Sequence, residues 1–483
     1  MEPNVPRYPL ALVLVVTLLG ATTIRPAQPS AEIVIRNGVI VTVEGQLAAD
    51  VLIRDHEITG IAENLTATAG AREIDASGML VPPGGIDPHV HLGGSRADDY
   101  TSGSAAALAG GITTISNFVS PRDGEEILDA LRRRAEDVRA QAIADVILHP
   151  LIRDPSPIPD ALEAMADAGH ASLKVFMVRP TFDHTVPGFM TALRAAGATG
   201  LLMMMHCEDA AIVSTTGARL MTEGRGSLRY FPQARPVLAE VVATQRAVAM
   251  SESTGAPIYI VHLSSESALR VAQDAQARGL PVYVETRPIY LHLTEERFAG
   301  QDRGLFVGQP PLRTLRDQDA LWTGLASGTV HVVGTDHVAY RREQKLDSDQ
   351  TVVRHRAGLN NLQVIRPMLY SEGVPRGRIT VEQFVAVTST NPAKLFGLYP
   401  RKGTVDVGAD TDLVLWDPGD TRPIRDADML SGSGYSVYSG WEITGWPRMT
   451  IRRGEVVYEN GPVTREAGSG QLVYRERVRA PML

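Results

Sequence analysis

Two histidines separated by one residue offer the simplest metal-binding chemistry in the chain. His89 and His91 stand in the segment IDPHVHL, directly after the apolar run GMLVPP. In an extended segment the side chains of residues i and i+2 point to the same side, so both imidazoles can chelate one cation. Two histidines that bind no metal, on the surface or in the core, are at least as common as a chelating pair. This pair alone is therefore a weak indication of a metal site.

Three more polar residues each end an apolar run. His206 ends GLLMMMH, His262 ends PIYIVH and Asp336 ends HVVGTD. A buried polar side chain without a partner costs several kcal/mol, so each position needs an explanation. Any one of them can be a satisfied core residue. A shared metal centre explains all five positions together.

Lys174 lies among apolar neighbours in SLKVFM. The amine can reach the rim of the fold along its apolar stem. Alternatively, a buried and uncharged amine can react with carbon dioxide, and the resulting carbamate can bridge two metal ions ~3.5–4 Å apart. Four histidines and one aspartate are few ligands for two ions, and a bridging anion would complete both sets.

The middle of the chain alternates short, continuous apolar runs with helical stretches. Continuous apolar runs are typical of strands buried on both faces, and their alternation with helices makes the strands parallel. Repeated βα units over about 300 residues favour an α/β fold of the closed (β/α)8 barrel type over an open sheet. In such a barrel the side chains at the carboxyl ends of the strands meet in one mouth.

Both chain ends are rich in short strands instead. Segments 32–80 and 402–464 alternate branched apolar and polar residues between glycine turns, which predicts antiparallel hairpins, the first turning at Asn37-Gly38. We expect these two segments to form one small composite β-sandwich. The barrel would then span residues 81–401, and residues 465–483 would form a C-terminal tail.

Composition excludes several classes of protein. The 483 residues carry a net charge of -8 with no Lys/Arg-rich run, which argues against a nucleic-acid binder. Cys207 is the only cysteine, so no intramolecular disulfide is possible, and we expect it in the core. No glycine-rich phosphate-binding motif follows a strand.

The first 31 residues stand apart from the fold. Leu10 to Ile24 is a nearly uninterrupted apolar stretch, too short to span a membrane comfortably, and is typical of an export signal or N-terminal anchor followed by a linker. A buried helix is the alternative. A signal would make the protein exported, periplasmic or membrane-anchored, with membrane contact only through this segment; otherwise it would be cytoplasmic.

The order of these residues resembles the binuclear amidohydrolase superfamily and, within it, the hydantoinases and dihydropyrimidinases. The likeness extends over nearly the whole chain after Glu32, through GGIDPHVHL, ALAGGITTI, SLKVFM, IVHLSS, ETRPIYL, PPLR, VVGTDH and TSTNPAKLFGLYPRKGTVDVGADTDLVLWDP. The resemblance implies a barrel beside a composite sandwich, a carboxylated Lys174 and two divalent metal ions per subunit, with zinc expected. It assigns one ion to His89, His91, Lys174 and Asp336, and the other to Lys174, His206 and His262.

The resemblance also implies an activity. A metal-bridging hydroxide would open a small cyclic amide such as a hydantoin or a dihydropyrimidine, Asp336 would transfer the proton, and the chain would form a homotetramer or homodimer. Gly93 replaces the arginine by which dihydroorotase-like relatives bind a carboxylate. The alternatives are a lactam, a dihydroorotate- or allantoin-like ring, or an acidic acyl amide as substrate, and a non-catalytic scaffold.

Three positions depart from the family pattern at the substrate. Arg179 replaces a tyrosine that supports the oxyanion, Gln309 replaces a serine, and Ala357 aligns with an asparagine. We expect Arg179 to act in catalysis and to bind an anionic substituent, because a guanidinium offers several charged donors. In the alternative, Arg179 turns outward to a loop carboxylate.

Overall fold

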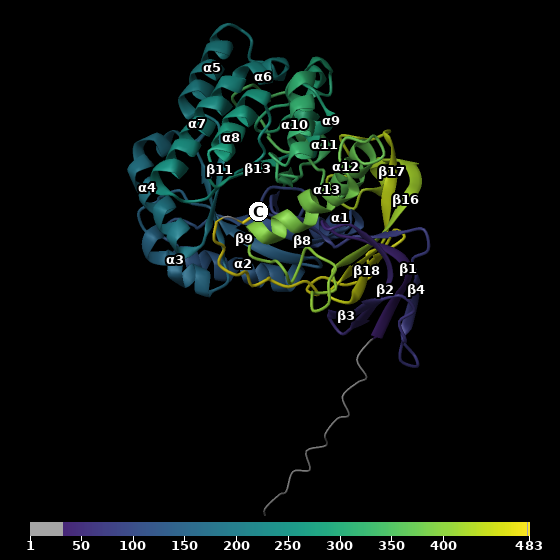
Figure 1. Cartoon of the computed structure of the whole chain (residues 1–483). Coiled ribbons are helices and arrows are strands. Elements are labelled where there is room, and N and C mark those ends of the chain that lie inside the picture. The colour runs from purple at the N-terminus through teal and green to yellow at the C-terminus, as the bar shows by residue number, and fades with distance from the viewer. Residues whose placement is uncertain (1–31, 481) are drawn as a thin grey trace, which may run out of the picture.

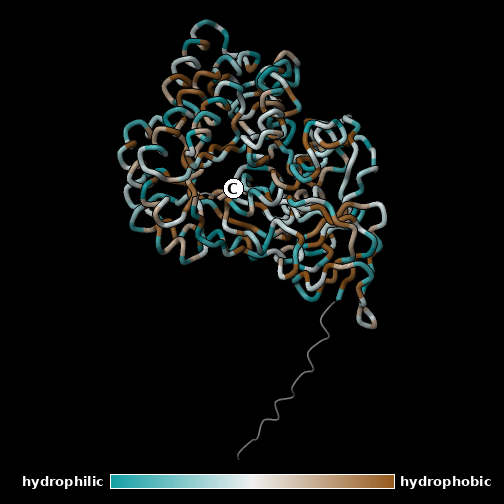
Figure 2. Tube along the Cα trace, viewed as in Figure 1, coloured by the Kyte–Doolittle hydropathy of each residue, from teal (hydrophilic) through white to brown (hydrophobic). Residues whose placement is uncertain are grey.

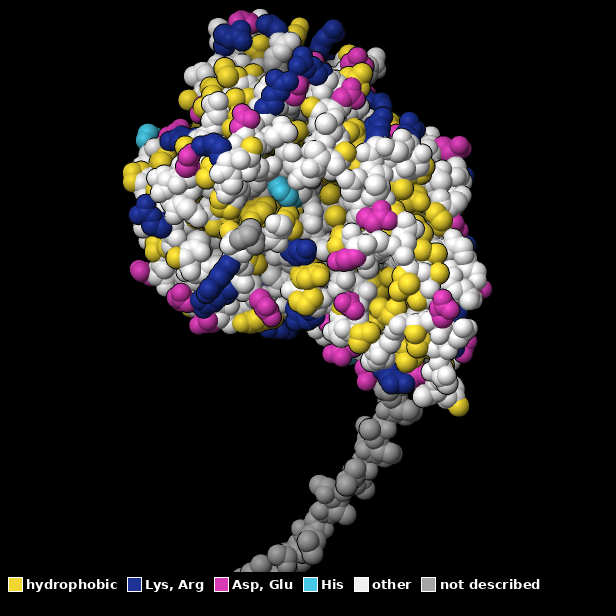
Figure 3. All heavy atoms as spheres, viewed as in Figure 1, with side chains coloured by type: hydrophobic (Ala, Val, Ile, Leu, Met, Phe, Trp, Pro, Cys, Tyr) yellow, Lys and Arg dark blue, Asp and Glu magenta, His cyan; other side chains and the backbone are white. Residues whose placement is uncertain are grey.

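The computed structural model describes residues 32–480 and 482–483. The predicted export signal therefore lies outside the described residues. No helix within the described residues is both long enough and apolar enough to cross a membrane. On the face seen in Figure 3, basic and acidic side chains are interspersed rather than gathered by sign.

One mixed sheet contains strands from both ends of the chain, as expected. Its order is β18-β17-β16-β5-β1-β2-β3, with β4 paired to β1. The short β5 joins the two ends, because it runs parallel to β1 and antiparallel to β16, where Trp416 pairs with Leu80. The strands are β1 (Glu32–Val41), β2 (Gln46–Arg54), β3 (Glu57–Ala62), β4 (Arg72–Asp75), β5 (Leu80–Val81), β16 (Leu413–Pro423), β17 (Glu442–Arg452) and β18 (Glu455–Glu459).

The hairpin turn predicted at Asn37-Gly38 is wrong. Strand β1 continues through both residues, and its register against β2 shifts between Ile35 and Gly38, which makes this a β-bulge. Asn37 takes the left-handed φ of 61° that also suits a turn. The Asp50 carboxylate accepts its backbone N–H at 3.2 Å, so a contact remote in sequence decides between bulge and turn.

The remaining strands form three parallel sheets. Their orders are β10-β11-β12-β13-β14, β6-β8-β9 and β15-β7, and a parallel bridge between Leu151 and Lys174 connects β9 to β10. Nearly every residue of these strands is buried, as their apolar sequences predict. They are β6 (Gly85–Asp87), β7 (Val90–His91), β8 (Ile112–Val119), β9 (Asp145–Pro150), β10 (Ser172–Phe176), β11 (Leu202–His206), β12 (Ile258–Ile260), β13 (Val282–Thr286), β14 (Val332–Val333) and β15 (His337–Val338).

Helices alternate with the parallel strands and lie outside them in Figure 1. Figure 2 shows the apolar segments gathered in the interior and the hydrophilic ones toward the outer turns. The helices are α1 (Tyr100–Ala109), α2 (Ile127–Gln141), α3 (Ile158–Asp167), α4 (Pro180–Thr199), α5 (Ala210–Thr222), α6 (Phe231–Ala234), α7 (Val237–Thr254), α8 (Glu266–Ala277), α9 (Pro288–His292), α10 (Leu315–Ser327), α11 (Arg342–Lys345), α12 (Ile365–Gly373), α13 (Val381–Val385) and α14 (Asn391–Leu395).

A buried ion cluster connects the mixed sheet to β9. The Lys402 ammonium lies 2.9 Å from Asp145 at the start of β9, and 2.7 Å from Asp412 just before β16. Arg453, between β17 and β18, contacts the second oxygen of Asp145 at 3.2 Å. A buried carboxylate needs such partners, so the two parts of the fold are fixed to one another here.

The C-terminal tail lies along the amino-terminal side of the parallel strands. Backbone hydrogen bonds join Val146 to Gln471 at 2.7 Å, and Val473 to Val146 at 2.9 Å. The buried Arg475 donates to the Leu148 carbonyl at 2.7 Å and to the Ser172 hydroxyl at 2.8 Å. In Figure 1 this segment runs from the mixed sheet past β9 to the marked end of the chain.

Candidate metal centre

His89, His91 and Asp336 come together at the ends of two paired strands. Strand β7 runs parallel to β15, so the HxH pair and the residue just before β15 arrive side by side. The Asp336 Oδ1 atom lies 3.2 Å from His89 Nε2 and 3.1 Å from His91 Nε2. One ligand atom from each of the three residues falls within 4.8 Å of the others, a spacing that suits one shared cation.

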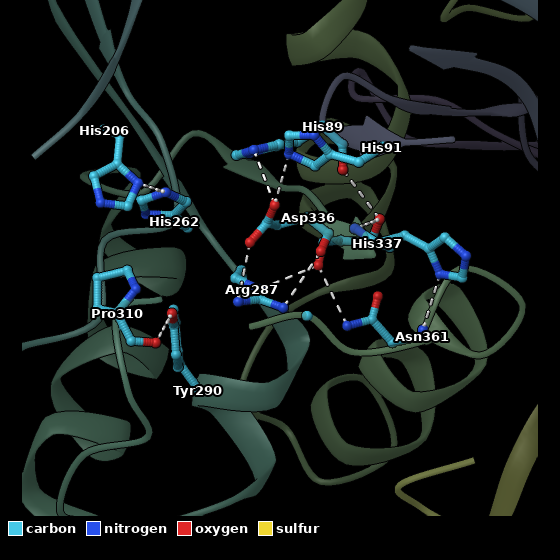
Figure 4. A network of polar contacts seen from close by, with 12 residues as sticks. His89, His91, His206, His262, Arg287, Tyr290, Pro310, Asp336, His337 and Asn361 are labelled. Atoms are coloured by element: carbon cyan, nitrogen blue, oxygen red, sulfur yellow. Dashed lines mark hydrogen bonds and ion pairs between the residues drawn. The ribbon is translucent and has the colours of Figure 1, made fainter. Parts of the chain in front are cut away.

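Arg287 fixes the other oxygen of Asp336. Its Nη1 lies 3.1 Å from Asp336 Oδ2, and its Nε donates to the Thr335 carbonyl at 3.1 Å. Figure 4 shows Asp336 between this guanidinium and the two histidines. Burial acts to raise the pKa of Asp336, but Arg287 and the histidines outweigh it and hold this pKa well below its usual range. The carboxylate is therefore ionised, which is the form that coordinates a metal ion.

His206 and His262 form a second pair on the neighbouring strands β11 and β12. His262 Nε2 lies 2.8 Å from His206 Nδ1, and the other ring nitrogen of His206 lies 2.8 Å from the Glu208 carboxylate. Arg235 in turn holds Glu208 through two hydrogen bonds. Carboxylates behind imidazoles orient the rings in this way in metal sites.

Glu285, at the end of β13, links the two pairs. One of its oxygens lies 2.6 Å from His89 Nδ1 and accepts the backbone N–H of His262 at 2.9 Å. The other oxygen accepts the Tyr259 hydroxyl at 2.9 Å. The His89 and His262 rings stack with centroids 5.4 Å apart, so the two histidine pairs belong to one site.

Two of these residues adopt strained backbone conformations. His262 has a φ of 42° and Asp336 a φ of 45°, in the left-handed region that residues other than glycine rarely adopt. The surrounding bonds from Glu285 and Arg287 compensate for that strain. Strain of this kind concentrates at functional sites, where it aims a side chain that regular strand geometry would direct elsewhere.

Lys174 is fully buried, and its charge acts on histidines of both pairs, His89, His206 and His262. Its Nζ makes no hydrogen bond within the described residues, and it lies 5.1 Å from the ring centroids of both Phe118 and Phe176. Burial lowers the pKa of Lys174 to about 8, which leaves a neutral, nucleophilic fraction of the amine at neutral pH. His262 Nδ1 is also buried without a partner. Orphaned donors of this type fit a site that is completed by a bridging anion and metal ions.

A cavity of about 170 Å³ opens above these residues. Two of the three predicted substrate positions, Gln309 and Ala357, line it. The Gln309 amide lies 2.8 Å from His355, and its segment is held by the Tyr290 hydroxyl, which donates to the Pro310 carbonyl at 2.7 Å (Figure 4). The full lining comprises His89, His91, Arg96, Phe176, His206, His262, Gln309, Asp336, Val338, Tyr340, Ala357 and Gly358.

Arg179 is not among the residues that line the cavity. Its guanidinium carbon lies 5.2 Å from the centroid of the Phe176 ring, which does line it. No carboxylate of the described residues lies within ion-pair distance of Arg179, so the loop partner of the alternative interpretation is not present either. Burial, with a contribution from the nearby Arg153, lowers the pKa of Arg179.

Several side chains of the site are not among the residues predicted from the sequence. Glu208 and Glu285 follow or end apolar runs as the histidines do, so the same rule of polar residues at strand ends could have found them. Arg287 stands one residue past β13, and its role depends on reaching Asp336 across the site. Arg96 lies in a loop after β7 whose path no local pattern indicates. Cys207 is buried, and burial raises the pKa of its thiol.

Comparison with known proteins gives matches over most of the chain. The profile of the amidohydrolase family matches residues 80–457. The D-hydantoinase of Rhizobium radiobacter is 35% identical over 462 residues, which cover 93% of this chain and 100% of that protein. The D-hydantoinase of Ralstonia pickettii is 33% identical over 464 residues, with the same coverage. The crystal structure of dihydropyrimidinase from Brevibacillus agri NCHU1002 superposes with a TM-score of 0.89 at 34% identity, and covers 93% of this chain and 100% of that one.

Proposed function

The chain belongs to the amidohydrolase family, and from this premise we propose that it is a metal-dependent hydrolase that opens small cyclic amides of the hydantoin or dihydropyrimidine type. The observation that carries this proposal is the orphaned Lys174 amine between two pairs of histidines. A scaffold protein has no need to bury an unpartnered lysine beside four histidines and a strained aspartate.

We propose the fold in finer detail as a closed (β/α)8 barrel over residues 81–401 and a composite β-sandwich of segments 32–80 and 402–464. The order β6-β8-β9, the bridge from β9 to β10 and the order β10 to β14 support one continuous circuit of strands. The pairing of β7 with β15 supports its closure. Residues 465–483 form the tail.

The proposed ligands fall into two sets that share Lys174. His89, His91 and Asp336 would hold one divalent ion, and His206 with His262 would hold the other. The carbamate of Lys174 would contribute one oxygen to each. The proposed ligand atoms are histidine nitrogens and carboxylate or carbamate oxygens, with no thiolate. Such atoms suit zinc among other divalent ions, and zinc is the ion we propose.

The chain's own residues then divide the chemistry. When bound, the two ions lower the pKa of a water molecule and polarise the amide carbonyl. Asp336 accepts the proton of that water as its oxygen joins the carbonyl carbon, and delivers the proton to the ring nitrogen as the C–N bond breaks. Arg287 keeps the Asp336 carboxylate aimed at the site during both steps. The product is one open chain that carries both the new carboxylic acid and the NH2 group of the released nitrogen.

Substrate contacts are proposed for the three positions that depart from the family. Gln309 and Ala357 would face the ring, as their place in the cavity lining supports. For Arg179 to support the oxyanion, its side chain must leave the Phe176 ring and enter the cavity. The cavity is small compared with the ~300–1,000 Å³ of pockets for drug-sized ligands, which favours a single ring with a short substituent.

Metal content and a substrate panel test the proposal together. The purified protein should contain close to two zinc or similar ions per chain by elemental analysis. It should hydrolyse at least one compound among hydantoins, dihydrouracil, dihydroorotate, allantoin and simple lactams. Chelation should abolish this turnover and added metal should restore it. A chain that binds no metal and hydrolyses none of these rings would be better explained as a scaffold.

Two broader proposals concern assembly and location. We propose a homotetramer or homodimer, which light scattering coupled to size exclusion would measure. We also propose that segment 1–31 is an export signal. The amino-terminal sequence of protein recovered from the producing cells would then begin near residue 31 rather than at Met1.

A further inference from the structure

The positively charged Arg96 lines the cavity, and the mechanism proposed above gives this residue no role. It lies in the loop between β7 and α1, five residues after His91, and lines the same cavity as the metal-binding histidines. Burial lowers its pKa, yet a guanidinium keeps its charge throughout the neutral range. Arg96 is half-buried, and removing a positive charge from water is costly unless something pairs with it.

The loop holds Arg96 in a fixed position. Gly93 and Gly94 take left-handed φ angles of 76° and 69°, which turn the chain sharply after the HxH pair. The Gly93 N–H donates to the Asp98 carbonyl at 2.8 Å, and the Gly93 carbonyl accepts Arg96 Nη1 at 3.1 Å. The Ala97 N–H then donates to the Ala339 carbonyl at 2.9 Å, which ties this loop to the segment after Asp336.

One edge of the guanidinium has no partner. Within the described residues Nη1 makes the only hydrogen bond of the Arg96 side chain, Nε is buried without one, and no carboxylate lies within ion-pair distance. The Nε and Nη2 donors form the edge that grips a carboxylate with two parallel bonds. Arg133 uses this edge on Glu125 at 2.8 Å for both bonds. In Arg96 the Nε atom of this edge is enclosed by protein, so Nη2 is the donor left to meet a ligand in the cavity.

The carboxylate closest in sequence cannot neutralise Arg96, because other groups occupy it. Asp98 lies 2.8 Å from His337 Nε2 through one oxygen, which also accepts the Ser431 hydroxyl at 2.6 Å. Its other oxygen accepts the Gly432 N–H at 2.6 Å. Asp98 therefore anchors the loop and leaves the charge of Arg96 available to the cavity.

Tyr340 adds a second polar side chain to the lining of the same cavity. It follows Ala339, whose carbonyl is bonded to the Arg96 loop, and it lines the same cavity. Its phenol is near enough to act on the pKa of Arg96, which it raises against the effect of burial. A cationic donor and a phenol that line one cavity of about 170 Å³ describe a subsite for a small anionic group.

We propose that Arg96, assisted by Tyr340, binds a carboxylate carried by the substrate, so that the preferred substrates are cyclic amides with a short acidic substituent. This inference rests on the proposed function. It assigns to Arg96 the anion recognition that the sequence suggested for Arg179.

A matched pair of substrates tests the assignment. 5-Carboxymethylhydantoin and its carboxamide, 5-carbamoylmethylhydantoin, have almost the same shape and differ in charge. The unaltered enzyme should favour the acid in kcat/KM by roughly 10- to 100-fold, the size of a charge-assisted hydrogen bond. Arg96→Gln should reduce that ratio to near one, and Tyr340→Phe should reduce it by a smaller factor. The surface change Arg132→Gln, at a side chain 70% exposed, should leave the ratio as it is.

Three results would overturn the assignment. They are equal kcat/KM values for the acid and the amide with the unaltered enzyme, an unchanged ratio in Arg96→Gln, and a ratio lost in Arg179→Gln but kept in Arg96→Gln. If neither compound is hydrolysed, the proposed function is at fault for these rings. Calorimetric titration of the metal-loaded protein then decides on Arg96: tighter binding of the acid that Arg96→Gln abolishes supports it, and equal binding of acid and amide rejects it.

Discussion

The Lys174 amine is buried, has no hydrogen-bond partner within the described residues and is partly neutral. Burying an unpartnered amine costs folding free energy. The two phenylalanine rings beside it exclude water, and no carboxylate of the described residues pairs with it. Such an amine is stabilised by becoming a carbamate, because the new anion can be satisfied by cations on both sides. The strand therefore suits the proposed modification of Lys174 better than it suits a stabilising contact.

Replacing Lys174 by alanine should empty or weaken both metal sites. The vacated space would leave each ion without its shared oxygen, so metal per chain should fall well below two and turnover should be lost. A short carboxylic acid in excess should restore part of both by occupying the gap. Elemental analysis and hydrolysis of the best panel substrate measure this.

Asp336→Asn is the matched control for that experiment. It retains the shape and one ligand oxygen, so we expect most of the metal to remain while turnover falls by about 10²-fold or more, the scale of a lost general acid and base. Unchanged metal content in Lys174→Ala would contradict the carbamate, and near-normal turnover in Asp336→Asn would mean that another group moves the proton.

The residues that could be predicted from the sequence share one property. His206, His262 and Asp336 each end an apolar run, so strand ends alone predict them, and the structure brings all three to one place. Arg287 and Arg96 could not be predicted in this way. Their roles depend on reach across the cavity and on which neighbouring carboxylates are already paired, and both are tertiary properties.

Among the elements, the loop between β7 and α1 is held by one buried carboxylate. Asp98 connects this loop to His337 on β15 and to Ser431 and Gly432 before β17. Burial acts to raise the pKa of Asp98, but the hydrogen bond and charge of His337 outweigh it and lower the pKa to about 2. A carboxyl with a lowered pKa stabilises the fold above its unfolded pKa and loses that contribution as the pH falls towards the folded value.

Asp98→Asn should therefore destabilise the protein in a pH-dependent way. Near pH 7 we expect the free energy of unfolding to fall by about 1–3 kcal/mol, the cost of a lost charged hydrogen bond. The difference from the unaltered protein should shrink between about pH 5 and pH 2, because the unfolded chain takes up the proton first and the native carboxyl follows only near its own pKa. Urea unfolding across this range measures it, with the exposed Asp123→Asn as control. A difference that stays constant with pH would refute the role of Asp98.

Local sequence patterns predicted the elements correctly where only one conformation fits the residues, and failed where two conformations fit them. The buried parallel strands follow from their apolar runs, since only an interior accepts them. Asn37-Gly38 suits both a turn and a bulge, and Asp50, thirteen positions later, selects the bulge. The pattern of segment 402–464 likewise predicts strands from its start, yet β16 starts only at Leu413. The Gly403 φ of 85° and its close approach to Ser389 favour a turn there.

For the whole molecule, the last residues close the end of the fold opposite the site. Val473 and Val478 belong to an apolar cluster with Leu202 and Tyr259 of the parallel strands. Arg475 bonds Ser172, two residues before Lys174 on the same strand. The tail thus lies against its own chain and supports the strand that carries the proposed bridging ligand.

Charging the buried face of the tail should weaken the whole fold. Val473→Asp places a carboxylate among apolar side chains, and we expect the melting temperature to fall by roughly 5–10 °C, since the cost is several kcal/mol. The neighbouring Tyr474→Asp, at a residue 55% exposed, should change it by much less. Differential scanning calorimetry compares the two variants. Equal shifts would show that the tail is not part of the core.

The pairing of Leu80 with Trp416 has a consequence for how the protein is made. A ribosome adds ~5–20 residues per second, so the first strands of the mixed sheet wait roughly 20 to 70 s for their partners to be synthesised. During that time β5 presents an open strand edge to every other nascent chain nearby, which is the situation that favours aggregation. The need for a chaperone should therefore be greatest while the middle of the chain is being translated, before either end can complete its sheet.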